Sequence, residues 1–354
     1  MGDRLDEYRR RRDAKRTPEP IPKSRPRKAK DDRFVIQQHH ARALHWDLRL
    51  ERDGVLVSWA VPRGLPRDQS RNHLAVHTED HPMEYLTFAG DIPAGEYGGG
   101  HMAVYDTGTY EAEKWKPDEV MVTLHGDKVS GRYVLFRTSK PGESGREDWM
   151  VRRMDPPAEG WTPMPALIRP MLAATARSLP SDDTAWSYEM QWAGVRAVGY
   201  VWGGRIKLLN QSDEDITAYY PAVREIGDAL APTEVVLDGE IVAFDKKTGG
   251  VRPAAPQTPG RRPSPGRAIQ YLLYDLIWLE GVSTVDVPYA ERRELLEGLG
   301  LTGPHWQTPP AFTGGGAFAL DAAREQGLAG VVAKRLGSPY APGKRSADWL
   351  RVDA

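Results

Sequence analysis

The chain has 354 residues, 27% of them charged and 40% hydrophobic, which is enough to bury a core and predicts two domains. Its formal net charge of −1 excludes a whole-protein field that would steer it to nucleic acid. Cysteine is absent, which excludes disulfides, thiolate metal sites and a cysteine nucleophile and fits a reducing cytoplasm. No apolar run reaches the roughly 18 residues of a membrane span, and no apolar signal segment follows the start, so we expect neither.

The N-terminal segment is polar and basic. Residues 1–33 hold 13 Lys or Arg against 7 Asp or Glu, including the run Arg9–Arg12. Such an arm can bind phosphate backbones without sequence preference, and the alternative is a solvated disordered tail. We expect residues 1–32 to form a basic flexible arm.

Residues 33–154 consist of short apolar runs separated by turn signals such as Asp53-Gly54 and Pro93-Ala94-Gly95. Regular spacing without a helical stretch predicts a small β-barrel or sandwich. The expected strands are Phe34–Gln38, Leu44–Leu50, Val55–Val61, His73–Thr78, Met102–Asp106, Val120–His125, Gly131–Arg137 and Trp149–Arg153.

The pattern changes after residues 155–170, which contain five prolines and predict a linker. From residue 171 to residue 354, strand-like and helix-like runs alternate, which predicts an α+β or α/β domain. The expected strands are Val195–Val201, Val235–Phe244, Ala268–Leu279 and Gly330–Lys334, and the expected helices are Pro221–Leu230, Tyr289–Leu296 and Ala317–Gln326. The segment Gly249–Gly266 is rich in Pro, Arg and Gly and is expected to be a mobile loop.

The stretch Gln37–Arg49 carries an unusual strand face. Leu44, Trp46 and Leu48 alternate with His45, Asp47 and Arg49, a period of two that is typical of a strand with one buried face. His39 lies six residues before His45. The polar face therefore joins metal-ligand side chains to a guanidinium that suits phosphate.

A second segment, Leu74–Pro82, has the same character, since a period of two places His77, Glu79 and His81 on one face. Imidazoles with a carboxylate suit Mn, Fe or Zn, and such an ion polarises a phosphoryl oxygen. With Arg49 as a charge clamp and a spare histidine as proton donor, the set predicts phosphoester cleavage. His101 and His125 are interpreted as structural.

Other interpretations remain open at this point. A lone histidine on a strand is usually a structural residue, and only the clustering favours a site here. The pair His45 and Asp47 with a distant histidine also fits a two-His-one-carboxylate iron oxygenase, although no 2-oxoacid pocket is evident. A non-catalytic scaffold is a further alternative.

Five runs of residues resemble the 3′-phosphoesterase domain of bacterial DNA ligase D. They are Phe34–His39, Leu44–Glu51, Trp59–Gly64, Ala75–Pro82 and Ile92–Gly98. The arm, from Leu5-Asp6-Glu7-Tyr8 through Arg12-Asp13 to Thr17-Pro18-Glu19-Pro20, resembles the N-terminal segment of that domain, so the resemblance covers about residues 1–154. It implies a small β-barrel that uses manganese to remove a 3′-terminal ribonucleoside and then the 3′-phosphate.

The resemblance also assigns roles by position. His39, His45 and Asp47 would be metal ligands, and Arg49 and His81 would contact the phosphate or the transition state. Further residues would line the site, namely Gln37, Arg63, Glu79 and Tyr85, and the arm residues Arg12, Asp13 and Glu19 would serve the ribonucleoside-removing step. One departure is His73, where the family usually has Arg. Because imidazole is shorter and only partly charged at pH 7, we predict that His73→Arg raises 3′-phosphate release.

The second domain resembles the nucleotidyltransferase (adenylation) domain of ATP-dependent DNA ligases, an ATP-grasp-like fold, over about residues 168–354. The runs that carry this resemblance are Tyr188–Arg196, Leu237–Val242, Tyr271–Leu276, Ala329–Arg335 and Trp349–Asp353. The first motif of that family is Lys-x-Asp-Gly, but this chain has Gln191-Trp192-Ala193-Gly194. A carboxamide nitrogen is not a nucleophile, so no lysyl-adenylate is expected at Gln191.

Other positions of the nucleotide pocket also differ from the family pattern. Gln211 stands in place of a phosphate-binding Arg, Ala329 replaces a metal-organising Glu, and Arg351 and Asp353 replace two lysines. Glu240 and Lys334 are retained. The chain ends at the last motif, so no C-terminal OB-fold is expected. We therefore expect a degenerate ligase-like domain that does not use ATP, with residual ligase activity as the alternative.

Together, these observations predict an α+β multidomain enzyme that heals 3′ ends of DNA or RNA-terminated DNA in bacterial non-homologous end joining. Manganese is the expected metal, with other divalent ions as alternatives. Expected partners are Ku and a separate active ligase. We expect no membrane association and a location in the cytoplasm, at the nucleoid.

Overall fold

The computed structural model describes residues 3–24, 30–138, 147–245, 247, 250–253 and 267–354. The chain divides into two compact units, Met1–Glu159 and Gly160–Ala354, here called the first and second unit. The described part has no helix long and apolar enough to cross a membrane.

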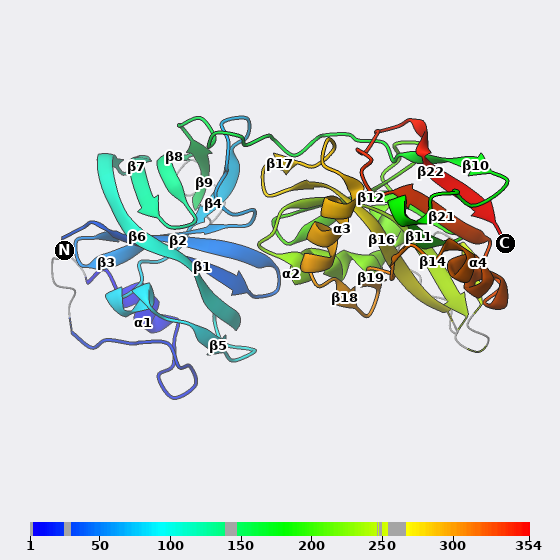
Figure 1. Cartoon of the computed structure of the whole chain (residues 1–354). Helices are drawn as coiled ribbons and strands as arrows, with labels where there is room; N and C mark the ends of the chain where they lie inside the picture. Colours follow the sequence, from blue (N-terminus) through cyan, green and yellow to red (C-terminus); the bar gives the residue numbers. More distant parts are fainter. Residues whose placement is uncertain (1–2, 25–29, 139–146, 246, 248–249, 254–266) are drawn as a thin grey trace. The chain divides into compact units, whose positions relative to one another are not determined.

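The first unit is a closed barrel of eight antiparallel strands. Its strands follow the ring order β1-β2-β3-β4-β9-β8-β7-β6, and β6 pairs back onto β1 while a short β5 extends from β6 (Figure 1). The eight barrel strands and β5 are β1 (Arg33–His40), β2 (Leu44–Arg52), β3 (Val55–Val61), β4 (His73–His77), β5 (Gly90–Ile92), β6 (Gly100–Lys116), β7 (Glu119–Gly126), β8 (Ser130–Arg137) and β9 (Glu147–Arg153). The predicted barrel is therefore present.

Some of the predicted boundaries were wrong. β6 has 17 residues, whereas the sequence predicted Met102–Asp106 only. Its exposed face is polar and charged (Glu111, Glu113, Lys114), so the apolar alternation fades although pairing with β7 continues to Lys116. β5 and a 3₁₀ turn at Met83–Leu86 are too short to give a periodic signal.

The N-terminal segment is packed against the barrel, in contrast to the flexible arm that we expected. It forms a short helix, α1 (Asp6–Arg10), and buries Leu5 and Tyr8 completely. These two side chains join an apolar cluster with Leu56 of β3 and Met102 of β6. Burial of this kind opposes fraying, because each large side chain stabilises the docked segment by roughly 1.5–3 kcal/mol.

The second unit contains two sheets flanked by short helices, as the alternating pattern predicted. One sheet has the order β10-β22-β21-β11-β20, and the other has the order β13-β12-β14-β16-β19-β18, with β15 on β14 and β17 on β16. The strands are β10 (Leu172–Ala176), β11 (Trp186–Gln191), β12 (Val195–Trp202), β13 (Arg205–Asn210), β14 (Val235–Asp245), β15 (Val251–Pro253), β16 (Arg267–Leu279), β17 (Val282–Ser283), β18 (Thr302–Gly303), β19 (Trp306–Gln307), β20 (Phe312–Thr313), β21 (Gly330–Arg335) and β22 (Arg345–Asp353).

The helices of the second unit lie near the predicted positions. They are α2 (Ile226–Leu230), α3 (Tyr289–Gly298) and α4 (Gly316–Glu325), with 3₁₀ turns at Asp183–Ala185, Thr217–Tyr219 and Pro221–Glu225. The predicted helix Pro221–Leu230 is thus a 3₁₀ turn followed by α2. The loop predicted at Gly249–Gly266 lies outside the described residues except for 250–253, where β15 pairs with β14.

Candidate functional site

Three potential metal ligands converge on adjacent strands of the first unit. His39 belongs to β1, His45 and Asp47 belong to β2, and one ligand atom from each lies within 4.8 Å of the other two. The antiparallel register pairs His39 directly with His45, which explains how residues six apart in the sequence meet. The ring nitrogens His39 Nδ1 and His45 Nε2 are 3.1 Å apart.

The surroundings of His45 leave its Nε2 as an acceptor that faces the cluster. His45 Nδ1 lies 3.0 Å from the carbonyl oxygen of Ala43, so this nitrogen carries the proton and Nε2 is left as an acceptor. Burial lowers the pKa of His39, although the Asp47 carboxylate partly offsets this effect. Neutral imidazoles are the form that binds metal ions.

Arg49 lies beside this cluster and is held on every side. Its guanidinium donates to Gln37 Oε1 at 2.7 Å, to Ser58 Oγ at 3.0 Å and to Asp47 Oδ2 at 2.8 Å. The Tyr85 ring lies over it, with its centroid 4.8 Å from the central carbon. Gln37 in turn donates to the carbonyl oxygens of Tyr85 and Phe88. Gln37 and Tyr85 therefore position Arg49.

His81 forms the opposite part of the pocket. Its Nδ1 lies 2.8 Å from the backbone oxygen of Glu79, and its Nε2 lies 3.3 Å from Arg12 Nη2. Burial, together with the nearby Arg49 and Arg12 guanidiniums, holds the pKa of His81 well below its usual value. His81 is therefore neutral at pH 7 and presents a lone pair at Nε2.

The N-terminal segment supplies one wall of the pocket. Arg12 bridges two carboxylates, with Nε 2.6 Å from Glu19 Oε1 and Nη1 2.8 Å from Glu79 Oε1. Glu19 also accepts hydrogen bonds from Thr17 and Tyr85. Two of the three predicted arm residues, Arg12 and Glu19, thus reach the cavity of about 160 Å³ that contains the cluster.

Several predicted residues do not line this cavity within the described structure. Asp13 is exposed and stabilises a turn, where its side chain accepts from Lys15 N. Arg63 is exposed in the turn after β3. His73 has Nδ1 2.7 Å from the Gly64 oxygen, and burial lowers its pKa. The structure does not bring these three to the cluster, and the effect of His73→Arg stays a prediction.

The predicted common face of His77, Glu79 and His81 was wrong. β4 ends at His77, whose ring packs against Trp59 and Trp149. The period of two stops there, and His81 returns through an isolated bridge to Leu56 of β3. Glu79 and His81 therefore enter the pocket without His77.

Three residues of the pocket region were missed by the sequence analysis. Ser58 contacts Arg49, Tyr97 lines the pocket rim, and Tyr8 packs under Arg12 at 3.8 Å and against the His81 ring at 5.2 Å. The alternation along β3, which places Ser58 opposite Arg49, is a signal for Ser58, whereas Tyr8 and Tyr97 lie in runs that carry the family resemblance.

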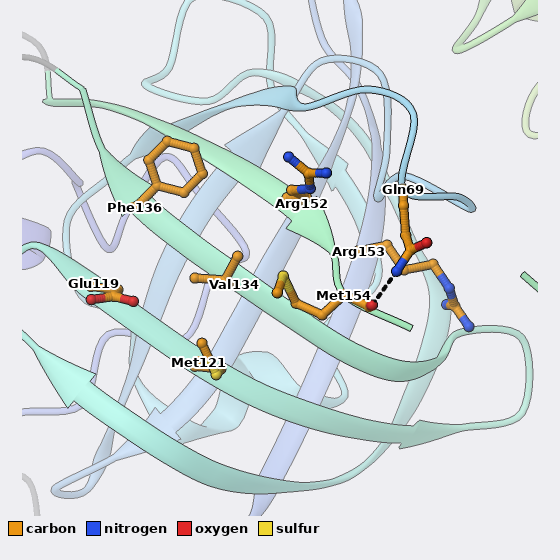
Figure 2. Close-up of a pocket in the computed structure, with 8 residues that line it drawn as sticks. All are labelled: Gln69, Glu119, Met121, Val134, Phe136, Arg152, Arg153 and Met154. Atoms are coloured by element: carbon orange, nitrogen blue, oxygen red, sulfur yellow. Dashed lines mark hydrogen bonds between the residues drawn. The ribbon is translucent and has the colours of Figure 1, made fainter. Parts of the chain in front are cut away.

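A second, larger hollow of about 370 Å³ lies on the outer surface of the barrel across β7, β8 and β9 (Figure 2). Met121, Val134 and Phe136 form much of its lining, and Gln69 at its edge donates to the Met154 oxygen. Its lining contains one carboxylate, Glu119, and no histidine. The smaller cavity therefore holds the chemically competent groups.

The ligase-motif residues Gln191, Glu240 and Lys334 of the second unit lie on β11, β14 and β21. Gln191 ends β11 beside Gly330 of β21. Lys334, from the same face of β21, has its Nζ 2.8 Å from Glu189 Oε1. Glu240 accepts from Gly194 N at 2.5 Å and from Tyr274 at 3.2 Å. Three further predicted positions are exposed, namely Ala193, Gln211 and Ala329.

Comparison with known proteins agrees with this two-part organisation. The model of the DNA Ligase D 3′-phosphoesterase domain matches residues 37–137, and the model of the ATP dependent DNA ligase domain matches residues 170–352. The multifunctional non-homologous end joining protein LigD of Mycobacterium bovis is 43% identical over 99% of this chain and 45% of its own length. The Pseudomonas aeruginosa protein of the same name is 34% identical over 98% of this chain and 47% of its own length.

Among solved structures, the ligase domain of Mycobacterium tuberculosis LigD is 33% identical, with a TM-score of 0.45, over 52% of this chain and 60% of that chain. The chain spans about half the length of the curated relatives it matches. It belongs to the ATP-dependent DNA ligase family, in the DNA ligase D arrangement in which a 3′-phosphoesterase domain precedes the ligase domain.

Proposed function

We propose that the first unit is a divalent-metal-dependent phosphoesterase that removes a 3′-terminal ribonucleoside or a 3′-phosphate from DNA ends in bacterial break repair. The observation that carries this proposal is the convergence of His39, His45 and Asp47 beside the buried guanidinium of Arg49. The match of residues 37–137 to the phosphoesterase model supports the same assignment.

The three convergent side chains fit a manganese ion. Two imidazole nitrogens and one carboxylate oxygen suit borderline divalent ions, and the ring nitrogens His39 Nδ1 and His45 Nε2, which lie 3.1 Å apart, are close enough to bind one ion together. When bound, the ion would polarise a phosphoryl oxygen and lower the pKa of a bound water. Other divalent ions are alternatives that the same assay compares.

Arg49 is suited to hold the phosphoryl group. Its hydrogen bonds to Gln37 and Ser58 fix the plane of the guanidinium. Its third hydrogen bond, to Asp47, places the positive charge next to the candidate metal ligands. A preorganised planar donor of this kind stabilises negative charge that grows on phosphoryl oxygens.

We assign His81 the role of proton acceptor at Nε2. The sequence favoured a proton donor, but a pKa held well below the usual value leaves His81 neutral at pH 7. Since Nδ1 is engaged by the Glu79 carbonyl, Nε2 is the atom that can take a proton from an attacking water. Arg12, whose Nη2 lies 3.3 Å from His81 Nε2, would then orient the substrate and would not take part in the proton transfer.

For the second unit, we propose that no lysyl-adenylate forms. Gln191 occupies the position of the nucleophilic lysine, and Lys334 of the neighbouring strand β21 is buried in an ion pair with Glu189. Adenylation requires a free amine as nucleophile. Gln191 has no amine, and the amine of Lys334 is held in the ion pair. The unit would then act as a docking platform for DNA ends or for a partner protein. Ku and a separate ligase would complete the repair at the nucleoid.

The decisive experiment uses a primer–template with a 3′-ribonucleotide or a 3′-phosphate, with manganese, with other divalent ions or with chelator. We expect cleavage only with metal, and a loss of at least about a hundredfold in His45→Ala and Asp47→Ala. His101→Ala is the matched control, because His101 is exposed and pairs with Asp91 outside the pocket. Full activity in either ligand variant would refute the metal assignment.

Assays of the parent protein also distinguish between the alternative functions. No cleavage with any metal, but retained binding to DNA ends, would favour a scaffold. Oxygen uptake that depends on 2-oxoglutarate would favour the iron oxygenase. For the second unit, incubation with labelled ATP and a divalent ion should give no covalent adduct, and an AMP adduct at any lysine would show that the adenylation proposal is wrong.

A further inference from the structure

Tyr97 is an exposed aromatic side chain at the rim of the pocket. Its side chain lines the cavity that holds the ligand cluster, yet 47% of the residue is exposed. Among the described residues of the first unit, Val104 is the other large hydrophobic residue with comparable exposure. Burial of an aromatic ring is favourable in free energy. Tyr97 is therefore suited to contact a ligand that enters the pocket and covers the ring.

The loop that carries Tyr97 holds the ring in place. Two hydrogen-bonded turns follow each other, with Glu96 N donating to Pro93 O at 3.1 Å and Gly99 N donating to Glu96 O at 3.1 Å. A Cβ at residue 99 would lie 2.8 Å from Pro93 O, and Gly98 has φ +78, so the glycines are required for this path. Tyr97 is therefore presented by a tight loop that links β5 to β6.

Charged groups of the N-terminal segment contact the ring. The Arg11 guanidinium lies 4.8 Å from the ring centroid, and that of Arg12 lies 5.5 Å away. The Tyr97 hydroxyl accepts from Arg11 and lies 3.4 Å from Glu79 Oε2. The ring is thus fixed by cation–π contacts and a polar anchor, and 47% of the residue is still exposed.

We propose that Tyr97 stacks on the base of the 3′-terminal ribonucleoside, the leaving group of the diester cleavage. This inference rests on the proposed phosphoesterase function. A terminal base has one face without a stacking neighbour, so a single fixed ring can cap it without separating other bases. Stacking also tolerates every base, since each has a π-face, which suits an enzyme that meets ends of any sequence.

The test is a cycle that combines Tyr97→Leu with removal of the terminal base. On a primer that ends in a ribonucleotide, Tyr97→Leu should lower kcat/KM by about 5- to 150-fold, the factor that corresponds to the loss of one base–aromatic stack. On a matched primer that ends in an abasic ribose, kcat/KM of the parent should fall by the same factor relative to the primer with a base. For Tyr97→Leu, removal of the base should not lower kcat/KM any further. Release of a 3′-phosphate, which has no leaving nucleoside, should be unchanged by the substitution.

Two further variants separate stacking from other roles. Tyr97→Phe keeps the ring and loses only the hydroxyl contacts, so it should cleave the ribonucleotide end like the parent. Tyr219→Leu, a tyrosine of the second unit with 40% exposure, is the control for loss of an exposed ring. Equal losses on the base-containing and abasic ends, or a loss in Tyr97→Phe as large as in Tyr97→Leu, would overturn the inference. A parent that cleaves no end would instead refute the proposed function.

Discussion

At the residue scale, the pocket depends on side chains that are each held by several partners. Arg49 illustrates this, since all of its nitrogens donate to fixed acceptors in Gln37, Ser58 and Asp47. Lysine would keep the charge, but an ammonium cannot reproduce the planar fork. The chemistry therefore depends on geometry as much as on charge.

This leads to a prediction for Arg49→Lys. We expect kcat for 3′-phosphate release to fall by about 10²- to 10³-fold, as for the loss of one preorganised donor in other enzymes. Steady-state kinetics measures the loss. Arg33→Lys is the matched control, because Arg33 forms an ion pair with Glu51 outside the cavity. Equal activity of parent and Arg49→Lys would contradict the proposed role.

The buried histidines make stability depend on pH. Burial lowers the pKa of His73 and of His81 below the usual value near 6.5. Below pH 6.5 the unfolded chain binds protons that the folded chain excludes, so stability is fully present above this pH and is lost as the pH falls. Each histidine contributes a slope of up to about 1.4 kcal/mol per pH unit.

We therefore expect the free energy of unfolding of the first unit to decrease between pH 7 and pH 5. Denaturant titrations with chelator present measure this decrease, and His73→Gln should reduce the slope. A slope that is the same in parent and variant would show that His73 protonates equally in the folded and unfolded chain.

At the scale of elements, α1 and the segment after it complete a site that the barrel strands begin. The Tyr8 ring packs against both Arg12 and His81, and its hydroxyl lies 2.8 Å from Pro20 O. This ring is fully buried, so docking of the segment and assembly of the pocket are one event. A local contact thus connects the N-terminus to the chemistry.

We expect Tyr8→Ala to lower the free energy of unfolding of the first unit by about 3–5 kcal/mol, as for other buried aromatic residues. Limited proteolysis should then cut the segment before the barrel. Tyr8→Phe keeps the ring and should cost only about 1 kcal/mol, the value of one hydrogen bond. If the two variants lost equal stability, the ring would not be what docks the segment.

At the scale of the whole molecule, the two units have separate cores and separate polar centres. The barrel holds the ligand cluster, whereas the second unit buries the ion pair of Arg292 and Asp275, with Nε 2.7 Å from Oδ1. A metal that binds the cluster should stabilise the first unit selectively. The expected gain is about 2.7 kcal/mol when the free metal is a hundred times its Kd.

Hydrogen exchange of the full chain with and without manganese tests this selectivity. We expect slower exchange in β1, β2 and the segment around Glu79, and no change in β11, β14 or β21. Asp47→Ala should abolish the protection. Protection that appears chiefly in the second unit would place the metal elsewhere.

The sequence alone was sufficient for the local features of this protein. Alternation along Leu44–Arg49 depends only on which side chains are apolar, so it predicted β2 and placed His45 and Asp47 on one face as candidate metal ligands. Residues matched to known motifs predicted the two-part organisation and the altered position 191, because such motifs are read directly from residue identity. These predictions depend on near neighbours in the chain.

The tertiary structure decided which distant residues meet. Docking of Tyr8, the contact of Arg12 with Glu79 67 residues away, and the placement of Tyr97 at the rim depend on how the closed barrel brings loops together. His77 shows the reverse case, since it shares the pattern of the site residues but faces Trp59 and Trp149. Long-range contacts are set by strand pairing and core packing, which local periodicity does not encode.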